Sequence, residues 1–304
     1  MNYHNPVLLK ESVDALAIKK DGVYVDVTFG GGGHSREILK QLGPDGKLFA
    51  FDQDPDALEN KIDDDRFVLI PENFRFISRF LRFYRIKKVD GILADLGVSS
   101  HQFDEAERGF STRFDGDLDM RMNQKSKLSA KEIINKYSEE KLAEILFLYG
   151  ELRNSRNIAK TIVEKRAEQK IETSFQLKEV LQKYLPNAVE HKILAQIFQA
   201  IRIEVNEELD ALRDFLVQIP SLLTAEGRLS VISYHSLEDR LVKRFISTGM
   251  FSGELEKDVF GNTKEPMQKI GKLIVPSAEE IKINNRARSA KLRIATLKKE
   301  RIKA

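Results

Sequence analysis

Cysteine is absent from the 304 residues, and its absence excludes three kinds of chemistry. The chain can hold no disulfide, no thiolate-bound metal and no cysteine nucleophile. Long hydrophobic runs are also missing: no stretch approaches the roughly 20 apolar residues that a membrane-spanning helix needs. The first residues, MNYHNPVLLKE, have neither the charged head nor the apolar core of a signal peptide. We therefore expect a cytoplasmic protein with no membrane partner.

The composition that is present is globular, but its charge is uneven. Hydrophobic residues make up 41% of the chain and charged residues 32%, which is typical of a protein with a buried core. The net charge is +3, yet residues 281–304 hold nine Lys/Arg and one Glu, so this tail carries +8 and the remainder −5. Such an asymmetry indicates either a basic tail that binds a polyanion or a solvated terminus.

Short hydrophobic segments alternate with helical ones in the first third of the chain. Strands are predicted at 23–29, 47–52, 66–70 and 89–95, which indicates a parallel sheet with crossover helices. From 116 to 218 the periodicity is almost entirely helical, with capping boxes at Ser129 and Thr173, and a strand returns at 227–233. We expect an α/β domain formed by residues 1–115 and 219–304, with a helical domain, residues 116–218, inserted into it.

Four consecutive glycines, in FGGGGHS at 29–35, separate the first predicted strand from a helix. Open α/β sheets bind ligands at this position. No Gly-Lys-Ser/Thr follows, so the pattern does not favour a phosphate-binding P-loop, and a dinucleotide or S-adenosylmethionine remains. Asp26, four residues before Gly30, favours the second. A carboxylate there repels a pyrophosphate but attracts the ammonium and sulfonium of S-adenosylmethionine.

Two further carboxylates close later strands. Asp52 lies 20 residues after Gly32, a spacing that suits a carboxylate accepting hydrogen bonds from the ribose hydroxyls of either cofactor. Asp95 ends the fourth predicted strand, and in a doubly wound sheet that strand end lies beside the glycine loop. Asp95 is therefore a candidate for contact with a methyl acceptor, and capping of the next turn is the alternative.

Longer motifs run in a fixed order over nearly the whole chain. They are HNPVLLKE (4–11), DVTFGGGGHS (26–35), DLGVSSHQ (95–102), ERGFSTRFDGDLDMRM (107–122), FQAIRIEVNEEL (198–209), YHSLEDR (234–240) and NNRARSAKLR (284–293). Together they resemble the RsmH (MraW) family of bacterial methyltransferases. The resemblance implies a Rossmann-like, class I S-adenosylmethionine-dependent methyltransferase sheet with an inserted all-helical domain. It also implies methylation of the exocyclic N4 of a cytidine in the decoding region of 16S rRNA, in the small ribosomal subunit.

The resemblance also implies a set of site residues. The implied cofactor contacts are Gly32, Gly33, His34, Asp52, Phe74, Asp95 and Gln102. For the aromatic contact, Phe76 is an alternative to Phe74.

Asp95 and His235 are the predicted catalytic residues. In YHSLEDR, Tyr234 offers a stacking face and His235 a hydrogen-bond partner for a flipped base, with helix capping as the alternative for His235. No metal site is expected, because no cluster of His, Asp and Glu completes a ligand set.

Basic side chains near the end of the chain are the predicted RNA contacts, together with Tyr234 at the target base. They are Arg286, Arg288, Lys291 and Arg293. The segment 75–88 is also basic, with six Lys/Arg and no acid, so its arginines form either a solvated face or further phosphate contacts. Phe76, Phe80 and Phe83 recur beside them at helical spacing, and we expect this stripe in the core.

Two other functions fit parts of the pattern. One is a non-catalytic ribosome-assembly factor that retains a cofactor site. The other is a DNA amino-methyltransferase, a class that usually carries Asp/Asn-Pro-Pro-aromatic where this chain has DLGV at 95–98. The oligomeric state is left open by the sequence, and a homodimer is compatible with it.

Overall fold

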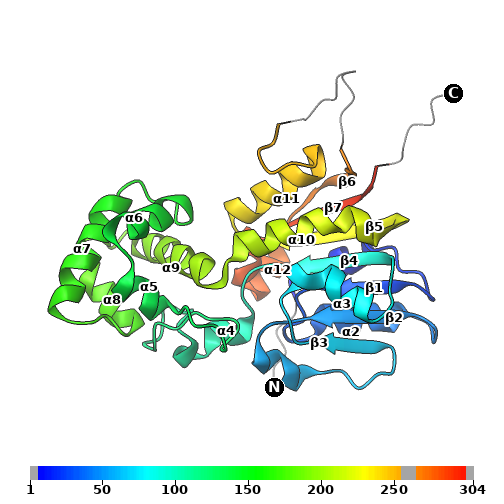
Figure 1. The fold of residues 1–304 in the computed structure, drawn as a ribbon, viewed down its shortest axis with the longest axis horizontal. Helices are drawn as coiled ribbons and strands as arrows, with labels where there is room; N and C mark the ends of the chain where they lie inside the picture. Colours follow the sequence, from blue (N-terminus) through cyan, green and yellow to red (C-terminus); the bar gives the residue numbers. More distant parts are fainter. Residues whose placement is uncertain (1–5, 255–264, 299–304) are drawn as a thin grey trace. The chain divides into compact units, whose positions relative to one another are not determined.

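The computed structural model describes residues 6–254 and 265–298, and the chain divides into two compact units. The first comprises residues 1–97 and 209–304, and the second comprises residues 98–208 (Figure 1). Both boundaries lie earlier in the chain than the predicted ones. Phe110, Leu118 and Met120 belong to the core of the second unit, so residues 98–115 fold with it. Phe215 packs edge-to-face on Phe74, which ties residues 209–218 to the first unit.

Seven strands form one sheet in the described residues, in the order β3-β2-β1-β4-β5-β7-β6. Strands β1 to β5 pair in parallel, whereas β7 is antiparallel to both β5 and β6. The predicted Rossmann-like sheet of parallel strands joined by crossover helices is confirmed. The strands are β1 Val23–Asp26, β2 Lys47–Phe51, β3 Phe67–Ile70, β4 Val89–Asp95, β5 Leu223–Ser233, β6 Met267–Ile274 and β7 Lys291–Leu297.

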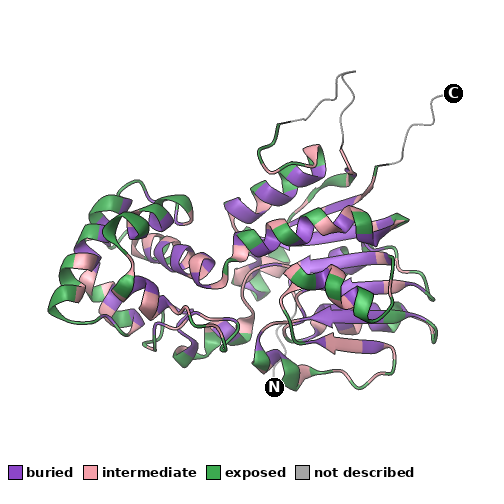
Figure 2. Cartoon of the chain, in the orientation of Figure 1, coloured by how far each residue is buried: buried purple, intermediate pink, exposed green. Residues whose placement is uncertain are grey.

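Hydrophobic residues occupy both faces of the central strands because helices cover both faces. In β2, Leu48 and Ala50 join one core cluster, while Phe51 packs edge-on against Phe80 of α3. Side chains alternate between faces along a strand, so burial on both sides requires a continuous apolar run. Figure 2 shows these strands as buried, and Figure 1 shows α3 and α10 over the same face. The helices associated with the sheet are α1 Leu9–Asp14, α2 Gly33–Gln41, α3 Ile77–Phe83, α10 Glu208–Leu222, α11 Ser236–Thr248 and α12 Ala278–Ile283.

The second unit is built from helices, and two of its helix starts follow the predicted caps. Thr173 and Gln176 form the predicted capping box, whereas Ser129 caps only through its own side chain. The α-helices are α4 Ser100–Asp104, α5 Ala130–Lys136, α6 Glu139–Leu148, α7 Ser155–Glu168, α8 Ser174–Val180 and α9 Glu190–Asn206. Short 3-10 helices occur in both units, at η1 Pro55–Asn60, η2 Phe74–Phe76, η3 Ala106–Arg108, η4 Gln182–Tyr184 and η5 Asn285–Ser289. None of the described helices combines the length and apolar character needed to cross a bilayer.

Gly91 of β4 occupies a position where the sheet leaves no room for a side chain. A Cβ there would lie 2.9 Å from two atoms of the buried Tyr24 ring and 3.1 Å from Leu16. Gly91→Ala should therefore lower the free energy of unfolding by roughly 1–3 kcal/mol, the usual cost of overpacking. Urea denaturation followed by circular dichroism measures the change. The control is Gly31→Ala, where nothing lies within 4 Å of the added Cβ. Equal stability of the two variants would contradict the packing described.

Candidate active site at the carboxyl edge of the sheet

The glycine loop is closely packed on one side and open on the other. Gly30 and Gly32 have φ angles of 48° and 75°, a left-handed conformation that side chains rarely adopt. A Cβ at Gly33 would lie 2.1 Å from Cγ of Pro6, so this glycine is required by close packing. Nothing lies within 4 Å of a Cβ built at Gly31. The loop therefore presents bare backbone at Gly31, where a ligand can approach closely.

Asp52, at the end of β2, holds this loop in place. Its Oδ2 accepts a hydrogen bond from the backbone N–H of Gly30 at 2.8 Å, and its Oδ1 accepts one from Asp54 at 2.9 Å. Burial raises the pKa of Asp52 to about 6, although both hydrogen bonds oppose that rise. A carboxylate oxygen can accept more than one hydrogen bond, so Asp52 retains capacity for a diol.

Asp26, at the end of β1, lies inside the turn that leads from the strand to α2. Its side chain is fully buried. Its oxygens accept hydrogen bonds from Ser35 Oγ at 2.7 Å and from the Thr28 backbone N–H at 3.1 Å. Burial raises its pKa to about 6. Asp26 therefore fixes the strand-to-helix turn from inside, and its attraction for a positively charged cofactor stays a prediction.

Asp95, at the end of β4, is joined to the end of β5 through a tyrosine. The Tyr234 hydroxyl donates a hydrogen bond to Asp95 Oδ1 at 2.7 Å. The Asp95 backbone N–H donates to Thr28 Oγ1 at 2.6 Å. Burial raises the pKa of Asp95 to about 6, whereas nearby His34 and the tyrosine hydroxyl lower it. Burial together with Asp95 raises the pKa of Tyr234 well above 10, so the phenol stays a donor.

His34, in the first turn of α2, is neutral and faces the same carboxylate. Burial lowers the pKa of the imidazole, with nearby Asp95 opposing that change. Nε2 lies 3.3 Å from the carbonyl oxygen of Val7, which only accepts, so the proton resides on Nε2. Nδ1 is then an acceptor, 3.8 Å from Asp95 Oδ2. Two neighbouring acceptors suit a group that donates several hydrogens, such as an ammonium or a primary amine.

The two aromatic candidates for cofactor contact differ in their surroundings. Phe74 packs edge-to-face on Phe215, and the preceding Asn73 donates to Gln53 at 2.9 Å, next to Asp52. Phe76 is 43% exposed and belongs to a different surface hollow. The structure thus brings Phe74, rather than Phe76, to the carboxyl edge.

Gln102 is the predicted cofactor contact that lies in the second unit. Its side-chain oxygen accepts a hydrogen bond from the Ser99 backbone N–H at 2.9 Å, completing the capping box that starts α4. The side chain is buried there. A contact between Gln102 and the cofactor stays a prediction.

His235 lies at the start of α11, where Glu238 caps the helix. The buried Glu238 carboxylate accepts from the backbone N–H groups of Tyr234 at 2.9 Å and His235 at 3.3 Å. His235 Nε2 lies 3.1 Å from Glu238 Oε1, within ion-pair distance, and neither ring nitrogen has a hydrogen-bond partner among the described residues. The capping alternative thus belongs to Glu238, and contact between His235 and a base stays a prediction.

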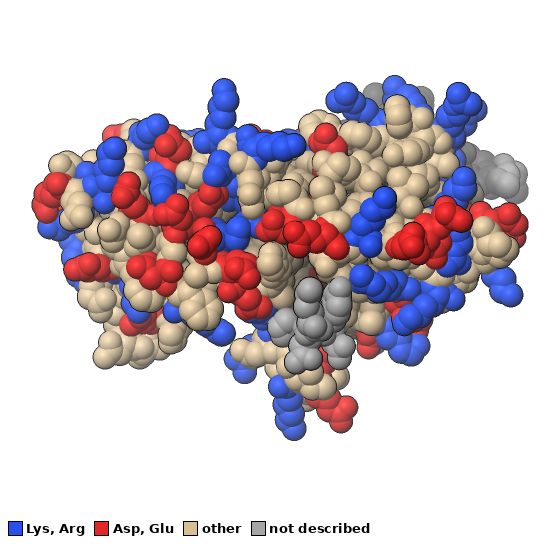
Figure 3. Space-filling view, turned by 90° about the horizontal axis from the view of Figure 1, so that it is seen from below, with Lys and Arg blue, Asp and Glu red and all other residues tan. Residues whose placement is uncertain are grey.

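The predicted RNA-binding side chains fall into two groups. Arg293 Nε and Lys291 Nζ lie 2.7 and 3.4 Å from the carboxylate of Asp239, which offsets part of their charge. Arg288 is exposed and Arg286 is partly buried. Acidic and basic side chains are interspersed on the face shown in Figure 3. The last basic residues of the tail, in 299–304, lie outside the described residues.

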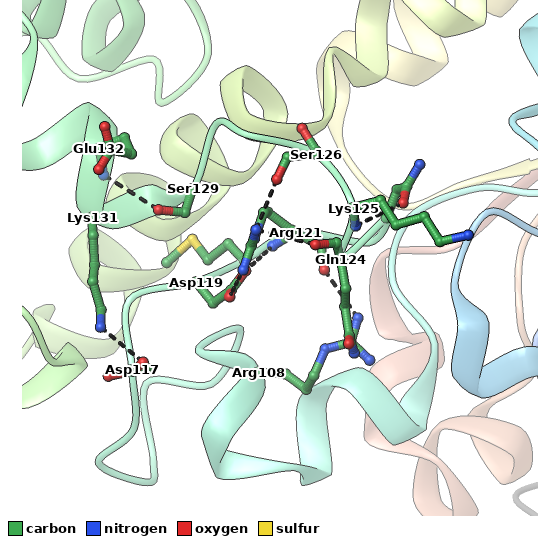
Figure 4. Close-up of polar contacts among 12 residues, drawn as sticks. Arg108, Asp117, Asp119, Arg121, Gln124, Lys125, Ser126, Ser129, Lys131 and Glu132 are labelled. Carbon is green, nitrogen blue, oxygen red and sulfur yellow. Dashed lines mark hydrogen bonds and ion pairs between the residues drawn. The ribbon is translucent and has the colours of Figure 1, made fainter.

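In the second unit, a dense set of hydrogen bonds fixes the segment that contains ERGFSTRFDGDLDMRM (Figure 4). Arg121 binds Asp119 through Nε at 2.8 Å and Nη2 at 2.6 Å, and its Nη1 donates to the Ser126 carbonyl at 2.7 Å. The buried Arg108 donates to the Arg121 carbonyl at 3.0 Å. These arginines serve the loop's own backbone, so the loop is ordered without a ligand.

Sequence reasoning missed two residues that shape the site. Thr28 joins the ends of β1 and β4, and Ser35 binds the buried Asp26. Ser35 stands where the dinucleotide fingerprint has its third glycine, and that substitution was the available signal. The sequence gave no signal for the role of Thr28, because its hydrogen-bond partner, Asp95, lies 67 residues away in the chain.

The open glycine backbone, the Asp52 carboxylate and the acceptor pair of His34 and Asp95 fit S-adenosylmethionine. Asp52 can accept hydrogen bonds from the ribose hydroxyls, and His34 Nδ1 can accept one from the ammonium, with the charge of Asp95 nearby. A dinucleotide would bring a pyrophosphate close to carboxylates, which repel it.

The family model described as the MraW methylase family matches residues 1–298. This chain belongs to that family. Its curated relatives include proteins named ribosomal RNA small subunit methyltransferase H from three bacteria. The protein from Flavobacterium johnsoniae is 68% identical, and that from Christiangramia forsetii 66%; each match covers 97% of this chain and 98% of the relative. The protein from Bacteroides fragilis is 55% identical, again over 97% and 98%.

Membership in the MraW methylase family decides between the alternatives for this edge of the sheet. The protein is a methyltransferase, and its cofactor is S-adenosylmethionine rather than a dinucleotide. The resemblance noted in the sequence is confirmed over residues 1–298.

Cofactor affinity should depend on pH through Asp52. Its folded pKa of about 6 means that the carboxylate is ionised at pH 7.5 and protonated below about pH 6. The protonated form has less acceptor capacity, so the affinity for S-adenosylmethionine should fall as the pH falls through 6. Asp52→Asn should weaken binding at pH 7.5 by roughly tenfold or more and make the pH dependence shallower. Calorimetry from pH 5 to 8 measures both effects.

The matched control is Asp45→Asn, an exposed aspartate in the turn before β2. Its affinity and pH profile should equal those of the wild type. An Asp52→Asn protein that binds as tightly as the wild type at every pH would contradict the role given to this carboxylate.

Proposed function

We propose that this MraW methylase transfers a methyl group from S-adenosylmethionine to the exocyclic N4 of a cytidine in the decoding region of 16S rRNA, within the small ribosomal subunit. Its relatives carry the name ribosomal RNA small subunit methyltransferase H, which supports ribosomal RNA as the substrate. The choice of N4 as the methylated atom rests on a hydrogen-bond acceptor, Asp95, at the carboxyl edge of the sheet, in a chain that contains no cysteine.

Chemistry at C5 of cytosine requires a nucleophile that this chain does not have. The C5 carbon becomes nucleophilic only after a thiolate adds to C6, which is a covalent route through an activated cysteine. With no cysteine in 304 residues, that route is closed. The exocyclic N4 needs no covalent adduct, and positioning can supply much of its reactivity.

Asp95 is the residue that we assign to the amine. S-adenosylmethionine supplies an electrophilic methyl group on a sulfonium. The N4 lone pair is delocalised into the cytosine ring, so an acceptor for an N4 hydrogen favours the pyramidal geometry that can receive a methyl group. Asp95 Oδ2 is suited to that task, because Tyr234 occupies Oδ1 and thereby orients the carboxylate. As the bond from N4 to the methyl carbon forms and the bond from carbon to sulfur breaks, the sulfonium would leave as a neutral thioether. Asp95 would accept the proton that the amine loses, which is the role of a general base.

The remaining predicted residues would hold the RNA. Tyr234 would border the base with its ring, and His235 would offer a ring nitrogen. Arg288 would contact phosphates with less competition than Lys291 and Arg293, which Asp239 already binds, and Arg286 is a further predicted contact. The DLGV sequence at 95–98 supports RNA over DNA, since it lacks the motif of DNA amino-methyltransferases.

The identity of the methylated nucleoside tests this proposal. Isolated small ribosomal subunits that lack the modification are incubated with the protein and S-adenosylmethionine, and the digested RNA is analysed by mass spectrometry. N4-methylcytidine is expected. Asp95→Asn should lower the single-turnover rate at saturating cofactor by about 10²-fold or more, the usual range for a general base. Asp45→Asn is the control and should retain full activity.

Formation of 5-methylcytidine, or transfer to DNA but not to the subunit, would contradict the proposed function. Full turnover by Asp95→Asn would remove Asp95 from the mechanism and leave the assignment of N4 in place.

A further inference from the structure

A hollow of about 450 Å³ lies on the surface between α3 and α10, both in the first unit. Ser78 and Gln218 join its walls: the Ser78 backbone N–H donates to the Gln218 side-chain oxygen at 3.1 Å, and Gln218 Nε2 donates to the Arg75 carbonyl at 2.8 Å. We call this feature the α3–α10 hollow. Its lining includes Arg75, Phe76, Arg79, Arg82, Asp214 and Val217.

The charge of the α3–α10 hollow is positive and only partly compensated. Arg75 binds Asp214 through Nε at 2.9 Å and Nη2 at 2.6 Å. Arg79 and Arg82 are exposed, and neither guanidinium has an ion pair or hydrogen bond among the described residues. Residues 75–88 contain six basic side chains and no acid, so the surrounding segment adds positive charge. An anionic partner would supply the missing countercharge.

An aromatic side chain is exposed beside these arginines. The stripe of Phe76, Phe80 and Phe83 was expected in the core, and this is wrong for two of its members. Phe80 packs inward against Phe51, but Phe76 is 43% exposed and Phe83 is 76% exposed. Helix α3 covers only seven residues, so its periodicity does not determine how much of each ring the sheet can cover. An exposed aromatic ring between arginines is typical of a surface that binds single-stranded nucleic acid.

We propose that the α3–α10 hollow binds a single-stranded segment of the ribosomal RNA substrate. Arg79 and Arg82 bind its phosphates, and Phe76 stacks on a base. This inference rests on the proposed function for the class of substrate. Arg75 directly follows Phe74, which lies at the carboxyl edge, so the hollow begins beside the candidate active site and can hold RNA that flanks the target cytidine.

A second copy of the chain fits the hollow less well. A two-fold interface through α3 would bring the same arginines of both copies together, and the acid in the lining, Asp214, is already bound to Arg75. RNA brings one negative charge per nucleotide and offers a base for Phe76. The charge therefore favours a polyanion over self-association.

The salt dependence of RNA binding tests the arginines. The probe is an unmodified small-subunit rRNA fragment that contains the target cytidine, and fluorescence anisotropy with the full chain gives the dissociation constant from 50 to 300 mM salt. Each lost phosphate contact on single-stranded RNA lowers the slope of log K against log salt by about 0.7. Arg79→Gln/Arg82→Gln should therefore have a slope about 1.4 smaller in magnitude. Lys20→Gln/Lys47→Gln removes the same charge from exposed side chains elsewhere in the unit and should leave the slope unchanged.

Base stacking is tested separately with two exposed phenylalanines. Phe76→Ala should weaken RNA binding on the order of tenfold, because stacking of a base on an aromatic ring is worth about that factor. Phe83→Ala is the matched control: it is more exposed than Phe76 but does not line the hollow. Cofactor affinity should be unchanged in all of these variants, which shows that they remain folded.

The outcomes separate this inference from the proposed function. Wild-type protein that neither binds nor methylates the RNA would contradict the proposed function itself. Wild-type activity with unchanged slopes and affinities in the hollow variants would overturn this inference alone. If the wild type has the mass of a dimer in solution and Arg79→Gln/Arg82→Gln that of a monomer, while the salt slope of RNA binding is unchanged, the hollow serves self-association. That result would also overturn this inference.

Discussion

The hydrogen bond from the Tyr234 hydroxyl to Asp95 is the interaction on which the proposed chemistry depends. It joins the ends of β4 and β5 over 2.7 Å and leaves Asp95 Oδ2 available beside His34. Because the pKa of Tyr234 is raised well above 10, the phenol donates at every pH at which the protein would act. The hydrogen bond from Tyr234 thus holds Oδ1 of the carboxylate in place, and it orients Oδ2 to accept a hydrogen bond from the target amine.

Three carboxylates at one sheet edge, one buried and two partly buried, lower the stability of the fold near neutral pH, and their place in the site explains this cost. Asp26, Asp52 and Asp95 each have a folded pKa of about 6, raised by burial above their ordinary value. The folded chain therefore holds protons that the unfolded chain releases between about pH 4 and 6. Their contribution to stability falls as the pH rises through that window and stays lower above it. Clusters of perturbed groups in this position are typical of functional sites.

Local patterns in the sequence predicted the five parallel strands and the glycine loop, because a buried parallel sheet requires apolar runs and a tight turn requires glycine. They did not predict the antiparallel strands β6 and β7. They could not predict which partner a polar side chain would find. The sequence did not show that Asp26 accepts a hydrogen bond from Ser35, or that Arg293 forms an ion pair with Asp239. The exposure of Phe76 was not predicted for a related reason. The spacing of the phenylalanines indicates that they share one face of a helix, but it does not indicate how many of the rings the sheet buries.

The central claim is that Asp95 and Tyr234 act on the target amine as one unit, and a double-mutant cycle tests it most directly. Single-turnover rates are measured at saturating cofactor and RNA for Asp95→Asn, Tyr234→Phe and the double variant. If the tyrosine acts by orienting the carboxylate, Tyr234→Phe should slow the wild type but change the Asp95→Asn protein little. Equal slowing by Tyr234→Phe in both backgrounds would show that the two residues act independently and would contradict the account.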